Sequence, residues 1–192
     1  MTKILIHICC APCAIYPLKK LKEKDNDVQG FWYNPGIYPD WEYQRRLRCL
    51  KAYAGREKIK VIYEYKKQES HFGSTEEEKC LNCYQLRLDK TANVAREGGF
   101  DLFTTTLLIS PYQKHELIRE IGEKAGRKMG VDFLYTDFRN GYREGITQAR
   151  EMKLYHQRYC GCARSIRERV ESKEKGTKAQ ELIADSYLAH CF

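Results

Sequence analysis

Short apolar runs alternate with longer amphipathic stretches along this chain of 192 residues. The runs at 4–8, 28–33, 59–65, 101–109 and 131–136 are bounded by Gly, Pro, Asn, Asp or Ser, as buried strands often are. Between them, apolar residues recur at helical spacing, as Leu81, Tyr84 and Leu88 do. Strands that alternate with helices predict an α/β fold with a mostly parallel sheet and helices on both faces.

Five strands in this order indicate a doubly wound sheet of the Rossmann-like or HUP-like kind, with the first strand in the centre. Pro12 and Pro17 are expected to end that strand, and the helix after it begins with Ile15 and Leu18. A capping box, Ser74 with Glu77 or Thr75 with Glu78, is expected to open a helix that runs to about Glu97. Three other helices are predicted. One runs from 40 to about 58, and one begins after 111 and ends near 126–130. A short one begins after a loop at 140–145 and ends at about 155. Two basic helices are expected near 163–175 and 178–189.

No linker or repeat divides the chain, so we expect one domain over 1–192, with the C-terminal helices 163–192 packed on it. No apolar run approaches the ~20 residues of a membrane span, and 4–8 is too short for a signal-peptide core. A cytoplasmic protein is therefore expected. In that compartment nine cysteines favour metal ligands or redox groups over a structural disulfide framework.

The net charge of +8 suits a polyanionic partner such as nucleic acid, although a solvated basic surface is an equal alternative. Lys and Arg cluster in 41–67, nine against three acids, and in 139–169, eight against three acids. Aromatic residues are interleaved with both clusters, among them Trp41, Tyr65 and Tyr142. Rings beside cations suit unpaired bases and phosphates, so RNA is the expected partner.

Three thiols, Cys9, Cys10 and Cys13, follow the first strand. In open α/β sheets ligands bind at the carboxyl ends of the strands, and nucleotide-binding relatives carry a Gly-rich turn there. No Gly lies between Ile4 and Asn26, so this turn offers sulfur instead. Soft thiolates select zinc, copper(I) or iron–sulfur rather than phosphate.

Two further thiol pairs occur, Cys80 with Cys83 on a predicted helix and Cys160 with Cys162 around a glycine. A structural zinc site is one interpretation, but zinc ribbons prefer C-x-x-C knuckles on hairpin turns. A [4Fe–4S] cluster fits scattered thiolates around a crevice better, and we assign it to the set Cys9, Cys10, Cys80 and Cys83. Cys160 and Cys162 would close a small, strained and easily reduced disulfide, which favours a redox pair. Cys49 and Cys191 are interpreted as buried apolar side chains.

Several sequence blocks resemble the QueH family of epoxyqueuosine reductases. They are Cys9-Cys10-Ala11-Pro12-Cys13, Cys80-Leu81-Asn82-Cys83-Tyr84-Gln85-Leu86-Arg87-Leu88, Thr104-Thr105-Thr106-Leu107-Leu108-Ile109-Ser110-Pro111-Tyr112, Asp137-Phe138-Arg139, and Lys153-Leu154-Tyr155 with Tyr159-Cys160-Gly161-Cys162. The resemblance implies reduction of the epoxide of epoxyqueuosine, at the wobble base of a tRNA anticodon, to the cyclopentene of queuosine. It also implies a cobalamin-independent oxidoreductase, a cluster on Cys9, Cys10, Cys80 and Cys83, and a redox role for Cys160 and Cys162.

Removal of an epoxide oxygen as water takes two electrons and two protons, and the oxygen must be polarised. Asp137 is a candidate for an acid that polarises this oxygen. It is equally a candidate ligand, with Cys13, for an additional iron ion beside the cluster, and a turn cap is its structural alternative. Arg87 and Arg139 are expected to hold phosphate or tune the cluster, or to form surface salt bridges. An external electron donor would reset the cysteine pair.

Two rival functions remain open. One is an iron–sulfur-dependent tRNA sulfur-transferase, but such enzymes activate the base with ATP, and no P-loop or G-x-G-x-x-G motif is present. The other is a non-enzymatic, zinc-stabilised RNA-binding module. Colour and metal analysis separates this module from the reductase, because zinc protein is colourless and iron–sulfur protein is brown.

Overall fold

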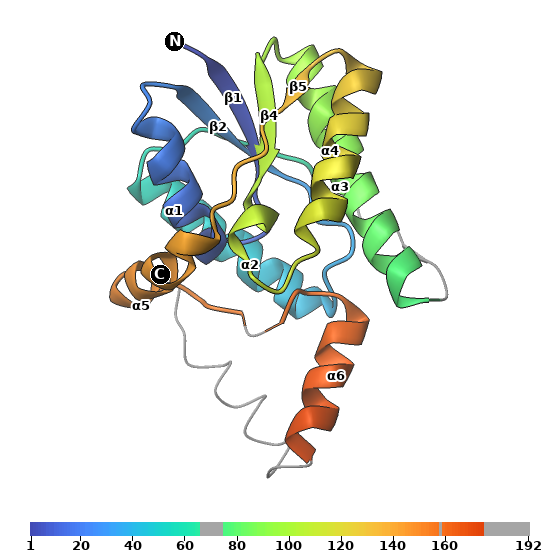
Figure 1. Cartoon of the computed structure of the whole chain (residues 1–192). Helices are drawn as coiled ribbons and strands as arrows, with labels where there is room; N and C mark the ends of the chain where they lie inside the picture. Colours follow the sequence, from blue (N-terminus) through green and yellow to red (C-terminus); the bar gives the residue numbers. More distant parts are fainter. Residues whose placement is uncertain (66–74, 158, 175–192) are drawn as a thin grey trace.

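A computed structural model describes residues 1–65, 75–157 and 159–174. Its five strands are β1 (Lys3–His7), β2 (Asp27–Trp32), β3 (Val61–Tyr63), β4 (Leu102–Thr105) and β5 (Asp132–Phe133). All neighbouring strands pair in parallel, in the order β3-β2-β1-β4-β5 (Figure 1). The doubly wound parallel sheet with a central first strand is therefore confirmed.

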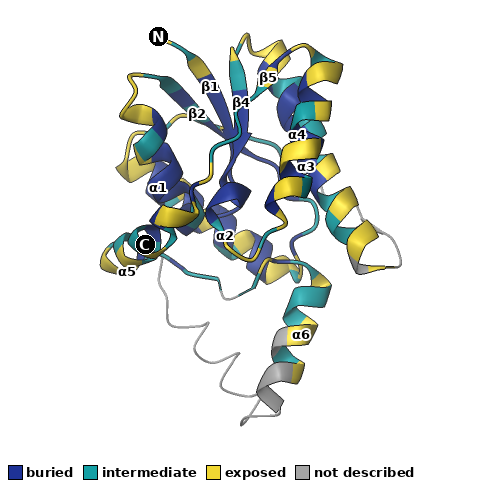
Figure 2. Ribbon diagram, viewed as in Figure 1, coloured by how far each residue is buried: buried dark blue, intermediate teal, exposed yellow. Residues whose placement is uncertain are grey.

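Helices cover both faces of this sheet (Figure 1). Four of them connect successive strands: α1 (Ala11–Lys22), α2 (Asp40–Arg56), α3 (Glu76–Glu97) and α4 (His115–Met129). Two more, α5 (Tyr142–Glu151) and α6 (Ala163–Glu174), follow β5. α1 packs against α5 on one side of the sheet, and α3 packs against α4 on the other. The three central strands, β2, β1 and β4, are largely buried, as strands of parallel sheets are, whereas the edge strands β3 and β5 are partly exposed (Figure 2).

Three predicted boundaries are wrong. The fourth strand ends at Thr105, because its side-chain oxygen accepts the backbone N–H of Leu107 at 3.1 Å and starts the 3-10 turn η1 (Thr106–Ile109). Pro17 lies inside α1, which begins at Ala11. The expected loop at 140–145 is instead the 3-10 turn η2 (Arg139–Gly141) followed directly by α5.

The predicted capping box is present at Thr75. Its side chain accepts the N–H of Glu78 at 3.2 Å, while the Glu78 carboxylate accepts the N–H of Thr75 at 3.1 Å. This box opens α3, the helix that carries Cys80 and Cys83.

The C-terminal segment is described only in part. α6 begins beside the Cys160–Cys162 segment and extends away from the sheet (Figure 1). The second predicted C-terminal helix, 178–189, and Cys191 lie outside the described residues. The packing of the C-terminal helices on a single domain stays a prediction.

Within the described part of the chain, no helix combines the length and hydropathy that crossing a bilayer requires.

Candidate functional site

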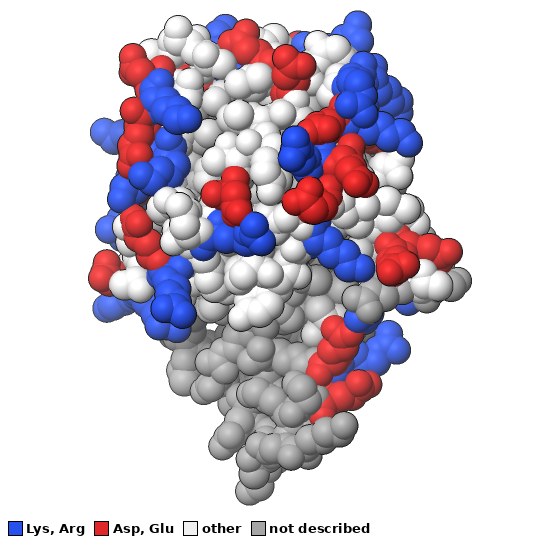
Figure 3. All heavy atoms as spheres, in the orientation of Figure 1, with Lys and Arg blue, Asp and Glu red and all other residues white. Residues whose placement is uncertain are grey.

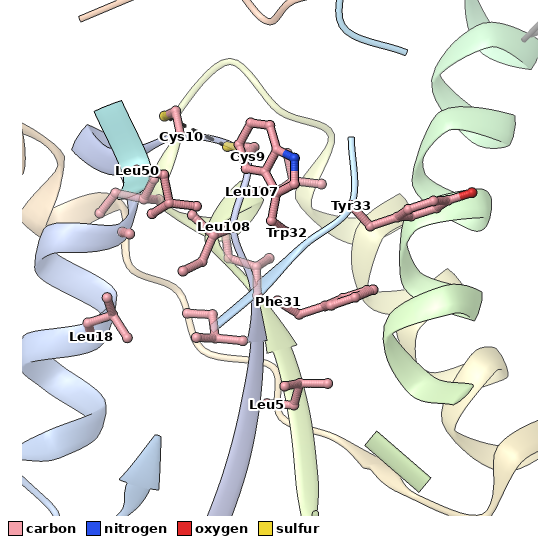
Figure 4. Close-up of a cluster of buried hydrophobic side chains, with 14 of the residues drawn as sticks. Leu5, Cys9, Cys10, Leu18, Phe31, Trp32, Tyr33, Leu50, Leu107 and Leu108 are labelled. Carbon is pink, nitrogen blue, oxygen red and sulfur yellow. Dashed lines mark hydrogen bonds between the residues drawn. The ribbon is translucent and has the colours of Figure 1, made fainter. Parts of the chain in front are cut away.

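The turn after β1 brings three thiols together at the carboxyl edge of the sheet. Cys9 and Cys10 are buried shortly after the strand (Figure 4). Cys13 lies in the first turn of α1. The Cys10 sulfur caps that helix, because it accepts the backbone N–H of Cys13 at 3.4 Å. The three sulfur atoms lie within 4.8 Å of one another, close enough to hold one metal centre.

Hydrogen bonds decide which of these thiols ionises first. The Cys10 and Cys13 thiols donate to the Cys9 sulfur and, together with the hydroxyl of Thr106 at 3.4 Å, hold the pKa of Cys9 well below its ordinary value. Burial raises the pKa of Cys10, and hydrogen bonds with the other two sulfurs raise that of Cys13. Cys9 is therefore the thiol that loses its proton most easily, and a metal that binds here would have to displace the protons of Cys10 and Cys13.

Gln157 joins this thiol group from the far end of the chain. Its side-chain amide donates to the sulfur of Cys10 at 2.7 Å and to that of Cys13 at 3.5 Å. Sequence reasoning missed Gln157, although its place three residues before Cys160, within the region of the family motifs, was a usable signal.

Cys80 and Cys83 lie half-buried in the first two turns of α3. Burial raises the pKa of Cys83, and charges on Arg87, Cys162 and Cys9 also act on it. The α3 pair is therefore within electrostatic reach of the other thiols. It is not part of the close group formed by Cys9, Cys10 and Cys13.

Cys160 and Cys162 form a second thiol pair, with their sulfur atoms 3.5 Å apart. The Cys160 thiol donates to the Cys162 sulfur, which also accepts the backbone N–H of Ser165 at 3.4 Å. Led by the bond from Cys160, these interactions lower the pKa of Cys162 to about 5 and raise that of Cys160. Cys162 is therefore a thiolate at neutral pH, the form that attacks sulfur.

A buried ion pair on α2 holds this cysteine loop. The Arg46 guanidinium is paired with Glu42 at 2.6 Å, and both side chains are inaccessible to solvent. Its two terminal nitrogens donate to the carbonyls of Cys160 and Tyr159 at 3.0 and 3.1 Å. The hydroxyl of Tyr155 donates to the same Glu42 carboxylate.

Gly161 fits against this anchor only because it lacks a side chain. Its φ is +113°, and a Cβ there would lie 3.0 Å from a terminal nitrogen of Arg46. Its carbonyl accepts the N–H of Tyr38 at 2.7 Å. The loop conformation is therefore fixed from two sides.

Asp137 lies apart from the thiols. Its carboxylate accepts hydrogen bonds from the Arg139 guanidinium at 2.5 and 2.9 Å, and these bonds lower its pKa to about 2. It lines a cavity of about 550 Å³, beside Tyr16 and Phe138, that no cysteine lines. Arg139 is thus a salt-bridge partner. Asp137 is ionised and therefore carries no proton that it could donate.

Several buried polar atoms of the described residues have no hydrogen-bond partner, and two of them belong to side chains that act on thiols: Gln157 donates to Cys10, and the Arg87 charge acts on Cys83. The atoms without a partner include Asn34 Oδ1, Arg87 Nε, His115 Nδ1 and Gln157 Oε1. Buried polar groups are normally satisfied, so such a set indicates space for a polar or charged group that the polypeptide does not supply. Together with the thiol donors, these atoms fit a metal–sulfur cofactor.

Exposed rings accompany cations near the strand ends, in part as predicted. The Lys51 ammonium lies over the stacked rings of Tyr63 and Tyr65, and Arg45 lies over Trp41. Lys and Arg side chains follow both flanks of the face in Figure 3, with a largely uncharged band between them. Other rings of these clusters, such as Tyr53, are core.

Comparison with known proteins gives a single family. The family model described as "Epoxyqueuosine reductase QueH" matches residues 4–168. A protein of that name from Thermotoga maritima is 35% identical over 184 residues, which cover 89% of this chain and 94% of the relative. One from Dehalococcoides mccartyi is 33% identical over 171 residues, covering 87% and 94%.

One solved structure supports the fold. The U34-tRNA thiolase NcsA from Methanococcus maripaludis, solved with its [4Fe-4S] cluster, superposes with a TM-score of 0.52 at 13% identity. The match covers 82% of this chain and 58% of the thiolase. At that identity the likeness shows a shared fold and nothing more.

Proposed function

Because the chain belongs to the epoxyqueuosine reductase QueH family, we propose that it reduces epoxyqueuosine in tRNA to queuosine. The epoxide takes up two electrons and two protons, its two C–O bonds break, and the oxygen leaves as water while a carbon–carbon double bond forms. The observation that supports this most strongly is the convergence of three thiols at the carboxyl end of β1.

The thiol donors suit a [4Fe–4S] cluster, and we assign its ligands to Cys9, Cys10, Cys80 and Cys83. When bound, such a cluster supplies single electrons at low potential. Cys13 remains as a spare thiol beside Cys10 and would serve an additional iron ion that polarises the oxygen. Asp137 lies apart from the thiols and would have to leave Arg139 to join that ion; its ionised carboxylate argues against the acid role.

Cys160 and Cys162 would supply the electron pair. Oxidation of this thiol–thiolate pair to a disulfide releases the two electrons that the epoxide needs and one proton, from Cys160; the second proton comes from solvent. The Cys162 thiolate lies 3.5 Å from the Cys160 sulfur, so closure needs a small movement. An external dithiol or flavin-type reductant would then restore the pair.

RNA binding would use the cations and exposed rings near the strand ends. Trp41 and Tyr65 are about half-exposed, and each has a cationic side chain against its ring. Such pairs suit the unpaired bases and phosphates of an anticodon loop. The substrate of the family's named activity is a tRNA, which fits this surface.

The test begins with anaerobic purification of the full chain and analysis of iron, sulfide and zinc. We expect about four irons and four sulfides per chain and a brown protein, the signature of one [4Fe–4S] cluster. Cys9→Ala and Cys83→Ala should lose most of the iron, whereas Cys49→Ala, a buried thiol outside the site, should keep it. A colourless protein with one zinc and no sulfide would instead support the RNA-binding module.

A tRNA sulfur-transferase is the remaining alternative, and it predicts a different product. Loaded protein would then place sulfur in tRNA in an ATP-dependent reaction. If epoxyqueuosine is left unreduced and thiolated tRNA appears, the reductase assignment is wrong.

A further inference from the structure

Among the residues that the structure describes, Arg87 is a buried cation with no ion pair to a carboxylate. Its side chain lies on α3 one turn after Cys83, is 5% exposed, and has no hydrogen-bond partner at Nε. Across the residues that the structure describes, the acids near α3 are engaged elsewhere: Glu64 pairs with Lys90, and Asp89 lies 4.0 Å from Lys128. A buried charge is costly unless it is paired, so the site requires an anion.

The groups that face Arg87 are thiols and a neutral imidazole. The Arg87 charge acts on Cys83 and on His7. Burial lowers the pKa of His7, and the Arg87 charge lowers it further. His7 Nε2 lies 3.2 Å from the Tyr33 carbonyl, which can only accept, so Nε2 carries the proton. Nδ1 then accepts from the Thr105 hydroxyl at 2.9 Å. His7 is thereby held neutral, so among the described groups on which the Arg87 charge acts here, the one that can carry negative charge is the Cys83 sulfur.

We propose that Arg87 is the counter-ion of an anionic iron–sulfur cluster at this edge and raises its reduction potential. This inference rests on the proposed function. A cluster held by four thiolates is negatively charged and gains one further negative charge when it accepts an electron. The reduced cluster is more negative than the oxidised one, so a fixed cation in a water-poor site stabilises the reduced cluster more. The reduction potential therefore rises.

The test is a redox titration of anaerobically reconstituted full-length protein, with dithionite as the reductant and viologen dyes as mediators. In Arg87→Gln the equilibrium constant for cluster reduction should fall about tenfold or more, which for one electron is about 59 mV towards lower potential. Arg87→Lys keeps the charge and should stay close to wild type. Arg96→Gln is the matched control on α3: Arg96 is exposed, donates to the Met129 carbonyl at 3.2 Å, and should leave the potential unchanged.

Each outcome of this titration supports or contradicts the counter-ion role of Arg87. If Arg87→Gln binds a full complement of iron and sulfide with a wild-type potential, the inference is wrong. If it also binds anticodon stem-loop RNA more weakly at that unchanged potential, Arg87 contacts phosphate instead. If Arg87→Gln fails to load, Arg87→Lys decides: normal loading with a near-wild-type potential supports a charge role, and failure to load refutes it. A wild-type chain that holds no iron and sulfide overturns the proposed function itself.

Discussion

Replacing Arg46 with Met removes the positive half of a buried ion pair and both hydrogen bonds that α2 makes to the cysteine loop. The Glu42 carboxylate would then be left buried with no cation, and the Tyr155 hydroxyl would still donate to it. Breaking such a pair from one side costs about 3–5 kcal/mol. Since the whole domain is stable by about 5–15 kcal/mol, Arg46→Met should come close to unfolding it.

Urea unfolding of the metal-free protein measures this loss directly. With a slope of about 1–3 kcal/mol per molar urea, the midpoint should fall by about 1–5 M. Because the penalty comes from the stranded carboxylate, the double variant Glu42→Gln/Arg46→Met should lose less than the two single variants together, by about 2 kcal/mol. Arg119→Met removes an i,i+4 partner of Glu123 in an exposed pair and should hardly change the midpoint.

A loss below about 1 kcal/mol for Arg46→Met, or strict additivity in the double variant, would refute the reasoning, since a buried ion pair cannot be removed so cheaply. Because Arg46 also holds the carbonyls of Tyr159 and Cys160, the variant should in addition change the fraction of Cys160–Cys162 disulfide at a fixed glutathione ratio. Unchanged disulfide content in Arg46→Met would contradict the anchoring role.

Three other predictions follow from the same contacts. Burial lowers the pKa of His7 from 6.5 to about 4. Between pH 6.5 and about pH 4, His7 therefore binds a proton in the unfolded chain but not in the folded protein. Stability should therefore fall by up to about 3 kcal/mol as the pH drops through this window, and urea unfolding of His7→Gln should show a weaker fall. Cys162, with a pKa of about 5, should react with iodoacetamide at nearly its full rate by about pH 6.5, as followed by peptide mass spectrometry; a midpoint above about pH 8 contradicts the assigned thiolate. Gly161→Ala should lower the thermal midpoint and disturb disulfide formation because its Cβ meets Arg46, whereas Gly99→Ala, also at positive φ but in open space, should have the smaller effect on both measurements.

Hydrophobic periodicity was sufficient for the sheet. The buried apolar runs located all five strands, their alternation with helices predicted a parallel sheet with the first strand in the centre, and the position of Cys9 and Cys10 after the first run put thiols at the carboxyl edge. The end of β4 was not predictable in this way. Leu107, Leu108 and Ile109 are buried in a 3-10 turn just as they would be in a strand, so burial alone does not distinguish the two.

The contacts that complete the site depend on the three-dimensional fold. Arg46 meets Tyr159 and Cys160 across more than 110 residues of sequence, and in the sequence it was only one of nine basic residues in a cluster. Gln157 reaches Cys10 across 147 positions. Neither contact leaves a local pattern, whereas spacing along a helix did predict that Cys80, Cys83 and Arg87 share one face.

The central claim is tested most directly by single-turnover reduction of the substrate. Anaerobically reconstituted full-length protein, reduced with dithionite and then freed of it, is mixed with tRNA that carries epoxyqueuosine, and the digested nucleosides are analysed by mass spectrometry. The account predicts queuosine, which lacks the epoxide oxygen, and no queuosine from metal-free protein or from the Cys160→Ser/Cys162→Ser variant. If loaded wild-type protein leaves epoxyqueuosine intact, or if the double variant converts it as well as wild type does, the account is contradicted.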